Sequence, residues 1–146
     1  MNALLGIGLG TALGLGWSCA VASNADPRLR EVLYDPNGVV TVPVKRGVVT
    51  LVVFGADESI VEVASGHGAD CAKANASWCV ATQPGARTLF VKPRSGAGPD
   101  NNLTVVTDRR IHNLRLVVLA EGDAGPPTYR LIMALLNFKW VAGHAG

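Results

Sequence analysis

Short runs of β-branched and aliphatic residues, separated by turn residues, recur along the chain from Asp26 onward. Strands of this kind, bounded by Gly, Pro, Asn and Asp, are typical of an all-β sandwich or barrel. The runs predict strands at 29–34, 39–44, 48–54, 60–63, 78–82, 88–92, 103–107 and 111–119, before a last apolar run at 129–141. We therefore predict one antiparallel β-sandwich-like domain over residues 26–131.

Two of these runs also predict where their strands lie in a sheet. Pro43 has no backbone N–H group, so the run at 39–44 is expected at a sheet edge. The run at 48–54 is almost continuously apolar, which favours a strand covered on both faces.

Alternation at 60–63 places Ile60 and Glu62 on one face of a strand, with Glu62 in solvent at its rim. Just before it, Asp57 and Glu58 are adjacent, so on a strand their side chains would face opposite sides. That geometry does not suit a shared acid–base site. We expect both carboxylates to be solvated turn residues.

The start of the chain carries no charged side chain before Asp26, and it is dominated by Ala, Leu and Gly. An apolar stretch at 3–15, followed by a small-x-small Ala-Val-Ala sequence, predicts a secretory signal peptide over residues 1–22. Cleavage after Ala25 is the alternative, and lipidation of Cys19 is a third option. The stretch is too short and too rich in glycine to predict a membrane-spanning anchor.

The net charge bears on nucleic-acid binding, and the cysteine content agrees with export. The formal net charge of +2 and the aromatic content of 5% do not favour nucleic-acid binding. Removal of the signal peptide leaves Cys71 and Cys79, an even number for an oxidising compartment. A candidate disulfide between them would close a short loop. The alternatives are two small apolar side chains on neighbouring loops, or a metal site that the spacing and the single nearby His67 disfavour.

Motifs for catalysis are weak. The histidines at 67, 112 and 144 are scattered and fit no metal-binding pattern. Ser65-Gly66-His67 lacks the strand-to-helix turn of a hydrolase nucleophile elbow, so a glycine loop is the better interpretation. We predict no catalytic residue, cofactor or metal. A small periplasmic hydrolase using His67 or His112 is the third-ranked function.

The sequence Thr107-Asp108-Arg109-Arg110 separates the runs at 103–107 and 111–119. One interpretation is a solvated hairpin corner, in which Asp108 bonds the backbone of the turn and both arginines lie in solvent. The other is that Arg109 and Arg110 contact a neighbouring subunit, because the planar guanidinium suits carboxylates at interfaces.

An ordered set of residues between about 26 and 132 resembles the CagX/TrbG family, which includes the ninth component of VirB-type secretion systems. The residues that carry the resemblance most clearly are Tyr34, Trp78, Lys92, Pro93, Asn102, Leu103 and Thr107. The resemblance implies a periplasmic structural subunit of a type IV secretion or conjugal transfer apparatus. Such subunits assemble as a ring in the outer-membrane core complex, beside a lipoprotein and an inner-membrane-anchored TonB-like subunit.

Two features depart from that family. Its members have a carboxy-terminal β domain that contacts the lipoprotein, whereas residues 132–146 of this sequence are an apolar, non-matching tail. A truncated gene, an engineered fragment and a naturally short form all fit this tail. Position 112 is His, where the family usually carries Tyr. The alternative to an assembly subunit is a free periplasmic β-sandwich that binds a peptide or glycan.

Overall fold

The structure is a computed structural model that describes residue 16 and residues 24–136. Apart from residue 16, the predicted signal peptide lies outside the described residues, and so do its predicted cleavage site after Ala22 and the possible lipidation site Cys19. Residues 137–146 at the end of the chain also lie outside them. Within the described part, no helix is long and apolar enough to cross a membrane.

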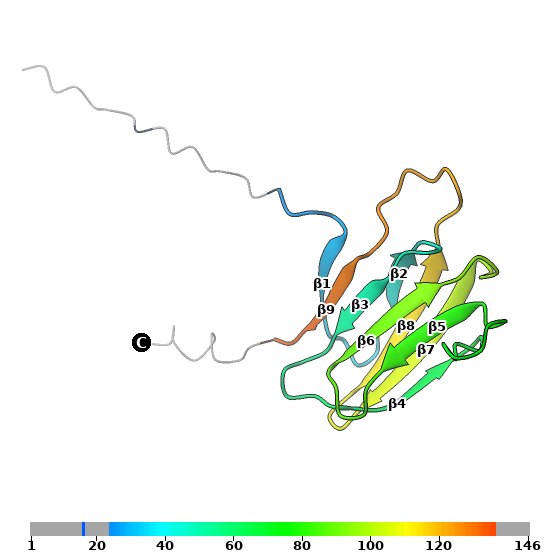
Figure 1. Ribbon diagram of the computed structural model, residues 1–146. Helices are drawn as coiled ribbons and strands as arrows, with labels where there is room; N and C mark the ends of the chain where they lie inside the picture. Colours follow the sequence, from blue (N-terminus) through cyan, green and yellow to red (C-terminus); the bar gives the residue numbers. More distant parts are fainter. Residues whose placement is uncertain (1–15, 17–23, 137–146) are drawn as a thin grey trace, which may run out of the picture.

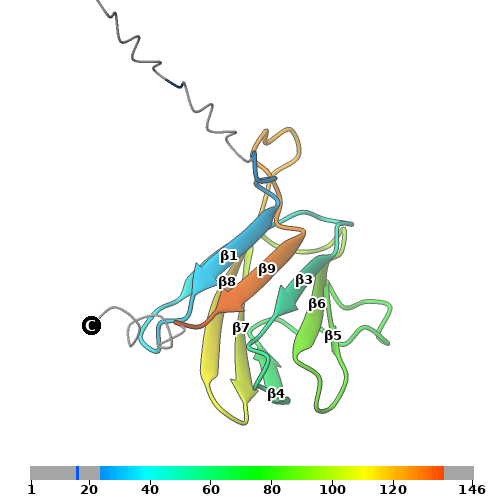
Figure 2. The same cartoon turned by 90° about the vertical axis from the view of Figure 1, so that its left-hand side faces the viewer.

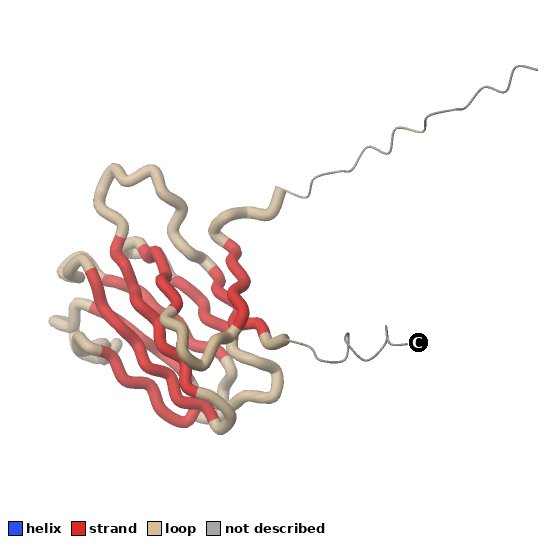
Figure 3. Tube along the Cα trace, turned by 180° about the vertical axis from the view of Figure 1, so that it is seen from behind, coloured by secondary structure: helices blue, strands red, loops and turns tan. Residues whose placement is uncertain are grey.

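Nine strands of the described chain form two sheets. Figures 1 and 2 show the two sheets packed face to face. The five-stranded sheet has the order β1 (Leu29–Leu33), β9 (Arg130–Ala134), β3 (Thr50–Val53), β6 (Thr88–Pro93) and β5 (Trp78–Thr82). The four-stranded sheet has the order β2 (Val40–Val44), β8 (Ile111–Val118), β7 (Asp100–Thr107) and β4 (Ile60–Ser65). Strands and loops account for all of the described chain (Figure 3), which confirms the predicted all-β sandwich.

The sheets are mixed, however, and not antiparallel throughout. β9 lies between β1 and β3 and is parallel to both, and β2 is parallel to β8. A parallel pair needs a crossover connection, and here the chain passes to the other sheet between the paired strands. After β1, for example, residues 34–39 lead to β2 in the four-stranded sheet.

Alternate residues of the two sheets meet in one apolar core. Trp78, at the start of β5, and Leu103, in β7, are fully buried. The remaining buried apolar side chains are Val42, Val44, Val52, Phe54, Ile60, Leu89, Val91, Ala97, Val105, Leu114, Leu116, Val118, Leu131 and Met133. β3 differs from the prediction, because Leu51 and Val53 stay partly exposed on the other face of the sheet.

Two further predictions, one of side-chain alternation and one of the domain boundary, need correction. A register shift between Ile60 and Glu62 leaves Ile60 buried and Glu62 exposed, so strict alternation is wrong for this strand. The predicted domain end at 131 falls inside β9. That strand continues to Ala134 between β1 and β3, and Met133 is part of the core.

Candidate functional site

The corner between β7 and β8 is a hydrogen-bonded turn. The Thr107 N–H donates to Arg110 O at 2.9 Å, and the Arg110 N–H donates to Thr107 Oγ1 at 2.9 Å. Asp108 bonds the neighbouring loop and not its own turn: Ser59 N donates to Asp108 Oδ1 at 2.9 Å, and Asp108 N donates to Ser59 O at 3.0 Å. The corner is therefore joined to the loop that precedes β4.

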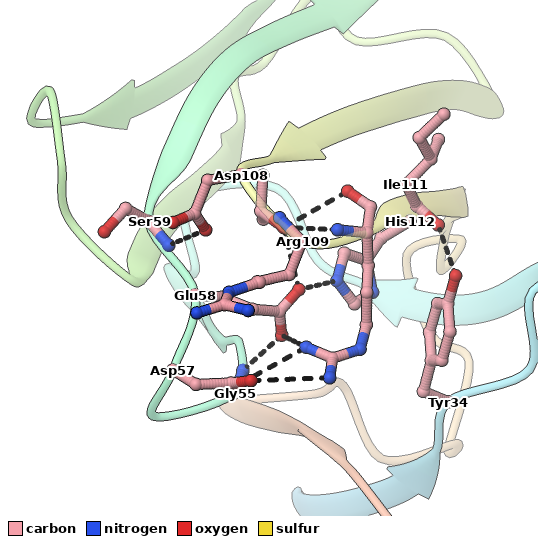
Figure 4. A network of polar contacts seen from close by, with 11 residues as sticks. Tyr34, Gly55, Asp57, Glu58, Ser59, Asp108, Arg109, Ile111 and His112 are labelled. Carbon is pink, nitrogen blue, oxygen red and sulfur yellow. Dashed lines mark hydrogen bonds and ion pairs between the residues drawn. The ribbon is translucent and has the colours of Figure 1, made fainter.

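Glu58, from that loop, is buried behind the corner (Figure 4). Its carboxylate accepts from Gly55 N at 2.7 Å and from Thr107 Oγ1 at 2.8 Å. His112 Nε2 lies 2.8 Å from Glu58 Oε1, so the tautomer with its proton on Nε2 completes the set of donors. A buried carboxylate is tolerated only with such partners.

The same contacts govern the ionisation of Glu58. Burial alone would raise its pKa, because the charged form loses water. The hydrogen bonds from His112, Thr107 and the Gly55 N–H favour the charged form, and together they hold the pKa below its ordinary value. The carboxylate is therefore negatively charged at neutral pH.

Arg110 supplies the nearest positive charge. Its Nη1 lies 3.3 Å from Asp57 Oδ1 and 3.4 Å from Glu58 Oε2, and only 24% of its side chain is exposed. The guanidinium also stands 5.9 Å from the centre of the Tyr34 ring. Arg110 is thus held inside the corner, and the interpretation that places it in solvent is wrong. Arg109, in contrast, is exposed.

The ring of His112 packs against two aromatic rings. Its centre lies 5.0 Å from the ring centre of Tyr34 and 4.6 Å from that of Phe54, in edge-to-face and tilted geometries. Tyr34 in turn donates its hydroxyl to Ile111 O at 3.3 Å. Histidine therefore packs as an aromatic residue at position 112 and also supplies a polar atom to Glu58.

An open cavity of about 700 Å³ adjoins this cluster, at the ends of β1, β9 and β3. Phe54, Ile132 and Leu135 contribute apolar surface, and Asp57 and Arg87 contribute charge. Gly55 and Arg110 line this cavity, whereas Glu58 does not, so the cavity reaches only the outer side of the cluster. A Cβ atom added at position 55 would stand 2.6 Å from Glu58 Oε2, so the glycine permits this close approach.

The residues that carry the family resemblance separate into three groups. Tyr34 and Thr107 lie in the corner, beside Arg110. Trp78, Leu103 and Pro93 are buried between the sheets. Lys92 and Asn102 lie on the outward faces of different sheets, so the structure does not bring these two together.

Cys71 and Cys79 form a disulfide in the structure. It fastens the loop at 66–77 to β5, where Val80 N also donates to Ala69 O at 3.0 Å. His67 is exposed in this loop and donates its backbone N–H to Asn101 Oδ1. Among residue 16 and residues 24–136, no group of three His, Cys, Asp or Glu side chains could hold a metal ion.

Glu58 is the residue that sequence reasoning misses. An acidic residue in a turn, next to another, is normally solvated, so the expectation of a solvated Glu58 is wrong. Its side-chain partners, Thr107 and His112, come from strands far along the chain. The nearest local signal is Gly55, three residues earlier, whose N–H the carboxylate accepts. Both carboxylate oxygens of Glu58 are hydrogen-bonded within the domain. The cluster is therefore suited to holding the corner in one conformation, with Arg109 exposed on it.

The chain belongs to the conjugal transfer protein family CagX, whose family model matches residues 27–140. It is 35% identical over 114 residues to the type IV secretion system protein PtlF of Bordetella pertussis. Homologues of PtlF in Bordetella parapertussis and Bordetella bronchiseptica have the same identity. The match covers 70% of this chain and only 38% of each relative. The family match extends into the tail that we predict to be non-matching.

Proposed function

We propose that this domain is a structural subunit of the periplasmic and outer-membrane core complex of a type IV secretion or conjugative transfer system. Family membership carries the proposal, since PtlF, a protein of a type IV secretion system, shares 35% of the aligned residues. The uncharged, apolar start of the sequence supports export to the periplasm. The domain acts by protein–protein contact, in a ring with the lipoprotein and the TonB-like subunit.

Arg109 is the side chain best placed for such a contact. It is exposed at a corner that Glu58, Arg110 and Thr107 hold in one conformation. A fixed backbone reduces the entropy lost when an exposed side chain binds a partner. Arg110 is less suitable than we predict from the sequence, because its guanidinium already contacts two carboxylates.

The test uses Arg109→Ala in cells that carry the other secretion genes. Less of the variant should co-purify with the core complex, and its unfolding free energy should stay within about 0.5 kcal/mol of the unsubstituted chain. Arg115→Ala is the matched control, since Arg115 is also exposed but pairs with Asp100 on the four-stranded sheet. If the unsubstituted chain fails to co-purify with any secretion subunit, the proposed function is wrong.

A further inference from the structure

The four outermost strands of the sandwich differ in how their free edges are treated. An unpaired edge is a template for another strand, and folded proteins usually block it. On β2, Pro43 has no N–H group, and its carbonyl accepts from Thr128 N at 2.8 Å. The neighbouring carbonyl of Thr41 accepts from Arg30 Nη1 at 3.0 Å. The free edge of β2 is therefore largely occupied.

The edges of β5 and β4 are also modified. The disulfide-bonded loop lies along β5, and Ala69 O accepts from the Val80 N–H. β4 carries the bulge between Ile60 and Glu62, and Ile60 N donates to Ala86 O at 2.8 Å. A bulge interrupts the regular spacing that an added strand needs.

On β1 the first outward N–H, that of Leu29, donates to Asp26 O at 3.0 Å, but the main-chain groups of Glu31 and Leu33 have no such partner within the described residues. Tyr34 N donates to Ala134 O, and Arg130 N donates to Arg28 O, so even-numbered residues of β1 face β9. Backbone groups of successive residues in a strand point to opposite sides. The main-chain groups of Glu31 and Leu33 are therefore directed away from β9, at the outer edge of the sheet that Figure 2 shows. We call this the open edge.

The side chains beside the open edge are largely apolar. Leu29 and Leu33 are 44% and 57% exposed, on the face of the five-stranded sheet that points away from the core. The registers β1–β9, β9–β3 and β3–β6 continue this face with the apolar side chains Ile132, Ala134, Leu51, Val53 and Phe90. The same face also carries Thr88 and the exposed Arg130, which lies opposite Leu29 and Leu51. An added strand would gain main-chain hydrogen bonds along β1 and apolar contacts beside it.

Charge distinguishes the possible occupants. Glu31 lies between Leu29 and Leu33 on this face, and it takes part in none of the ion pairs within residues 24–136. Two copies of β1 paired antiparallel about their centres would place Glu31 opposite Glu31. Like charges directly opposite each other destabilise a strand pair. A basic side chain opposite Glu31 would instead stabilise it.

We infer that the open edge of β1 accepts an extended segment of a different polypeptide, which adds a sixth strand to the five-stranded sheet. The segment carries a basic residue opposite Glu31, with apolar residues two positions before and after it, opposite Leu29 and Leu33. This inference rests on the proposed function, because it assigns the edge to another subunit of the secretion complex.

The experiment places a photo-crosslinking amino acid at position 33 of the full chain, in cells that carry the other secretion genes. The crosslinked peptide, sequenced by mass spectrometry, should come from another subunit and show the apolar–basic–apolar pattern. Glu31→Pro should abolish the product without unfolding the chain, since it removes the carboxylate and a main-chain N–H that points outward from the sheet. Thr41→Pro is the matched control, because it makes the same change at the occupied edge of β2 and should leave the crosslink intact.

Other outcomes overturn the inference. They are a crosslink to a second copy of this chain or to its own residues 137–146, a crosslinked segment without the pattern, a product that persists in Glu31→Pro, or no product. If the chain still co-purifies with the core complex in any of these cases, the proposed function stands and only the open-edge assignment fails. Absence of co-purification removes the proposed function itself.

Discussion

At the corner between β7 and β8, polar groups are buried and find their partners within the domain. At the open edge of β1, polar main-chain groups are exposed and find none among the described residues. Glu58 in the corner accepts three hydrogen bonds, whereas the amides of Glu31 and Leu33 point outward. The difference separates polar groups that hold the fold together from those that remain available for a partner.

The two outward faces of the sandwich show a related contrast. On the four-stranded sheet, Thr104 donates to Asn113, and Arg115 pairs with Asp100 across strands. The corresponding face of the five-stranded sheet carries Phe90, Leu29 and Leu33 in exposed positions. The contrast is one of degree, since Ile111 and Val61 are exposed on strands of the four-stranded sheet and Arg130 is exposed on the other sheet. Exposed apolar side chains that lie together are typical of an interaction surface.

Replacement of Glu58 by Ala should have the largest effect on stability. It leaves the Gly55 N–H, Thr107 Oγ1 and His112 Nε2 buried without their acceptor. We expect a loss of about 3–5 kcal/mol in the free energy of unfolding, as for other broken buried pairs. Chemical denaturation measures it. Glu62→Ala, an exposed change four residues away, should lie within about 0.5 kcal/mol of the unsubstituted chain. Equal effects would mean that the corner is not a stabilising element.

Removal of the disulfide should have the next largest effect. In Cys71→Ser with Cys79→Ser, the loop is no longer fastened along β5, and a second edge becomes accessible. From the loop-closure entropy of a nine-residue loop, we expect the free energy of unfolding to fall by about 2–3 kcal/mol. Thermal or denaturant unfolding of both forms measures the difference. Unchanged stability and unchanged solubility would show that the loop covers this edge without the disulfide.

Acid should weaken the corner. The pKa of Glu58 lies below its ordinary value in the fold, so the unfolded chain binds more protons as the pH falls. The contribution of Glu58 is fully present above the ordinary glutamate pKa and is lost as the pH falls through the lower, folded value. Denaturation at a series of acidic pH values measures this. The free energy of unfolding should fall less steeply with decreasing pH in Glu58→Gln than in Glu62→Gln. Identical slopes would contradict the assigned hydrogen bonds.

Changes at the open edge should have the smallest effect on stability. Leu33→Thr keeps a strand-forming residue and removes an exposed apolar group, so the free energy of unfolding should change by at most about 0.5 kcal/mol. Denaturation of the purified chain measures this, beside Leu103→Thr as a buried control. A loss at position 33 as large as that at position 103 would place Leu33 in the core and remove the contrast with the corner.

The positions of most strands follow from local sequence. The run at 78–82 is β5 with the predicted bounds, and Pro43 lies on an edge strand as expected. Such features depend on alternation and on the missing N–H of proline, which a single segment displays. Strand partners depend on the whole chain. The parallel neighbours of β9 therefore escape prediction, as does the bulge after Ile60.

The corner illustrates the same limit for a site. Thr107-Asp108-Arg109-Arg110 is recognisable as a turn, and the structure has a turn there. Nothing within these four residues indicates that Arg110 meets Asp57, or that Thr107 meets Glu58. Both partners come from much earlier in the chain. Glu58 precedes Thr107 by 49 residues, and Asp57 precedes Arg110 by 53 residues.

The parallel pairing of β1 with β9 has a consequence for folding kinetics. Leu29 pairs with Arg130, so the first strand of the domain cannot dock until nearly all of the described chain is available. Non-local pairings slow folding, because the entropy of loop closure is lost before the contacts form. A chain that crosses a membrane from its amino terminus would therefore expose β1 for the whole of its passage.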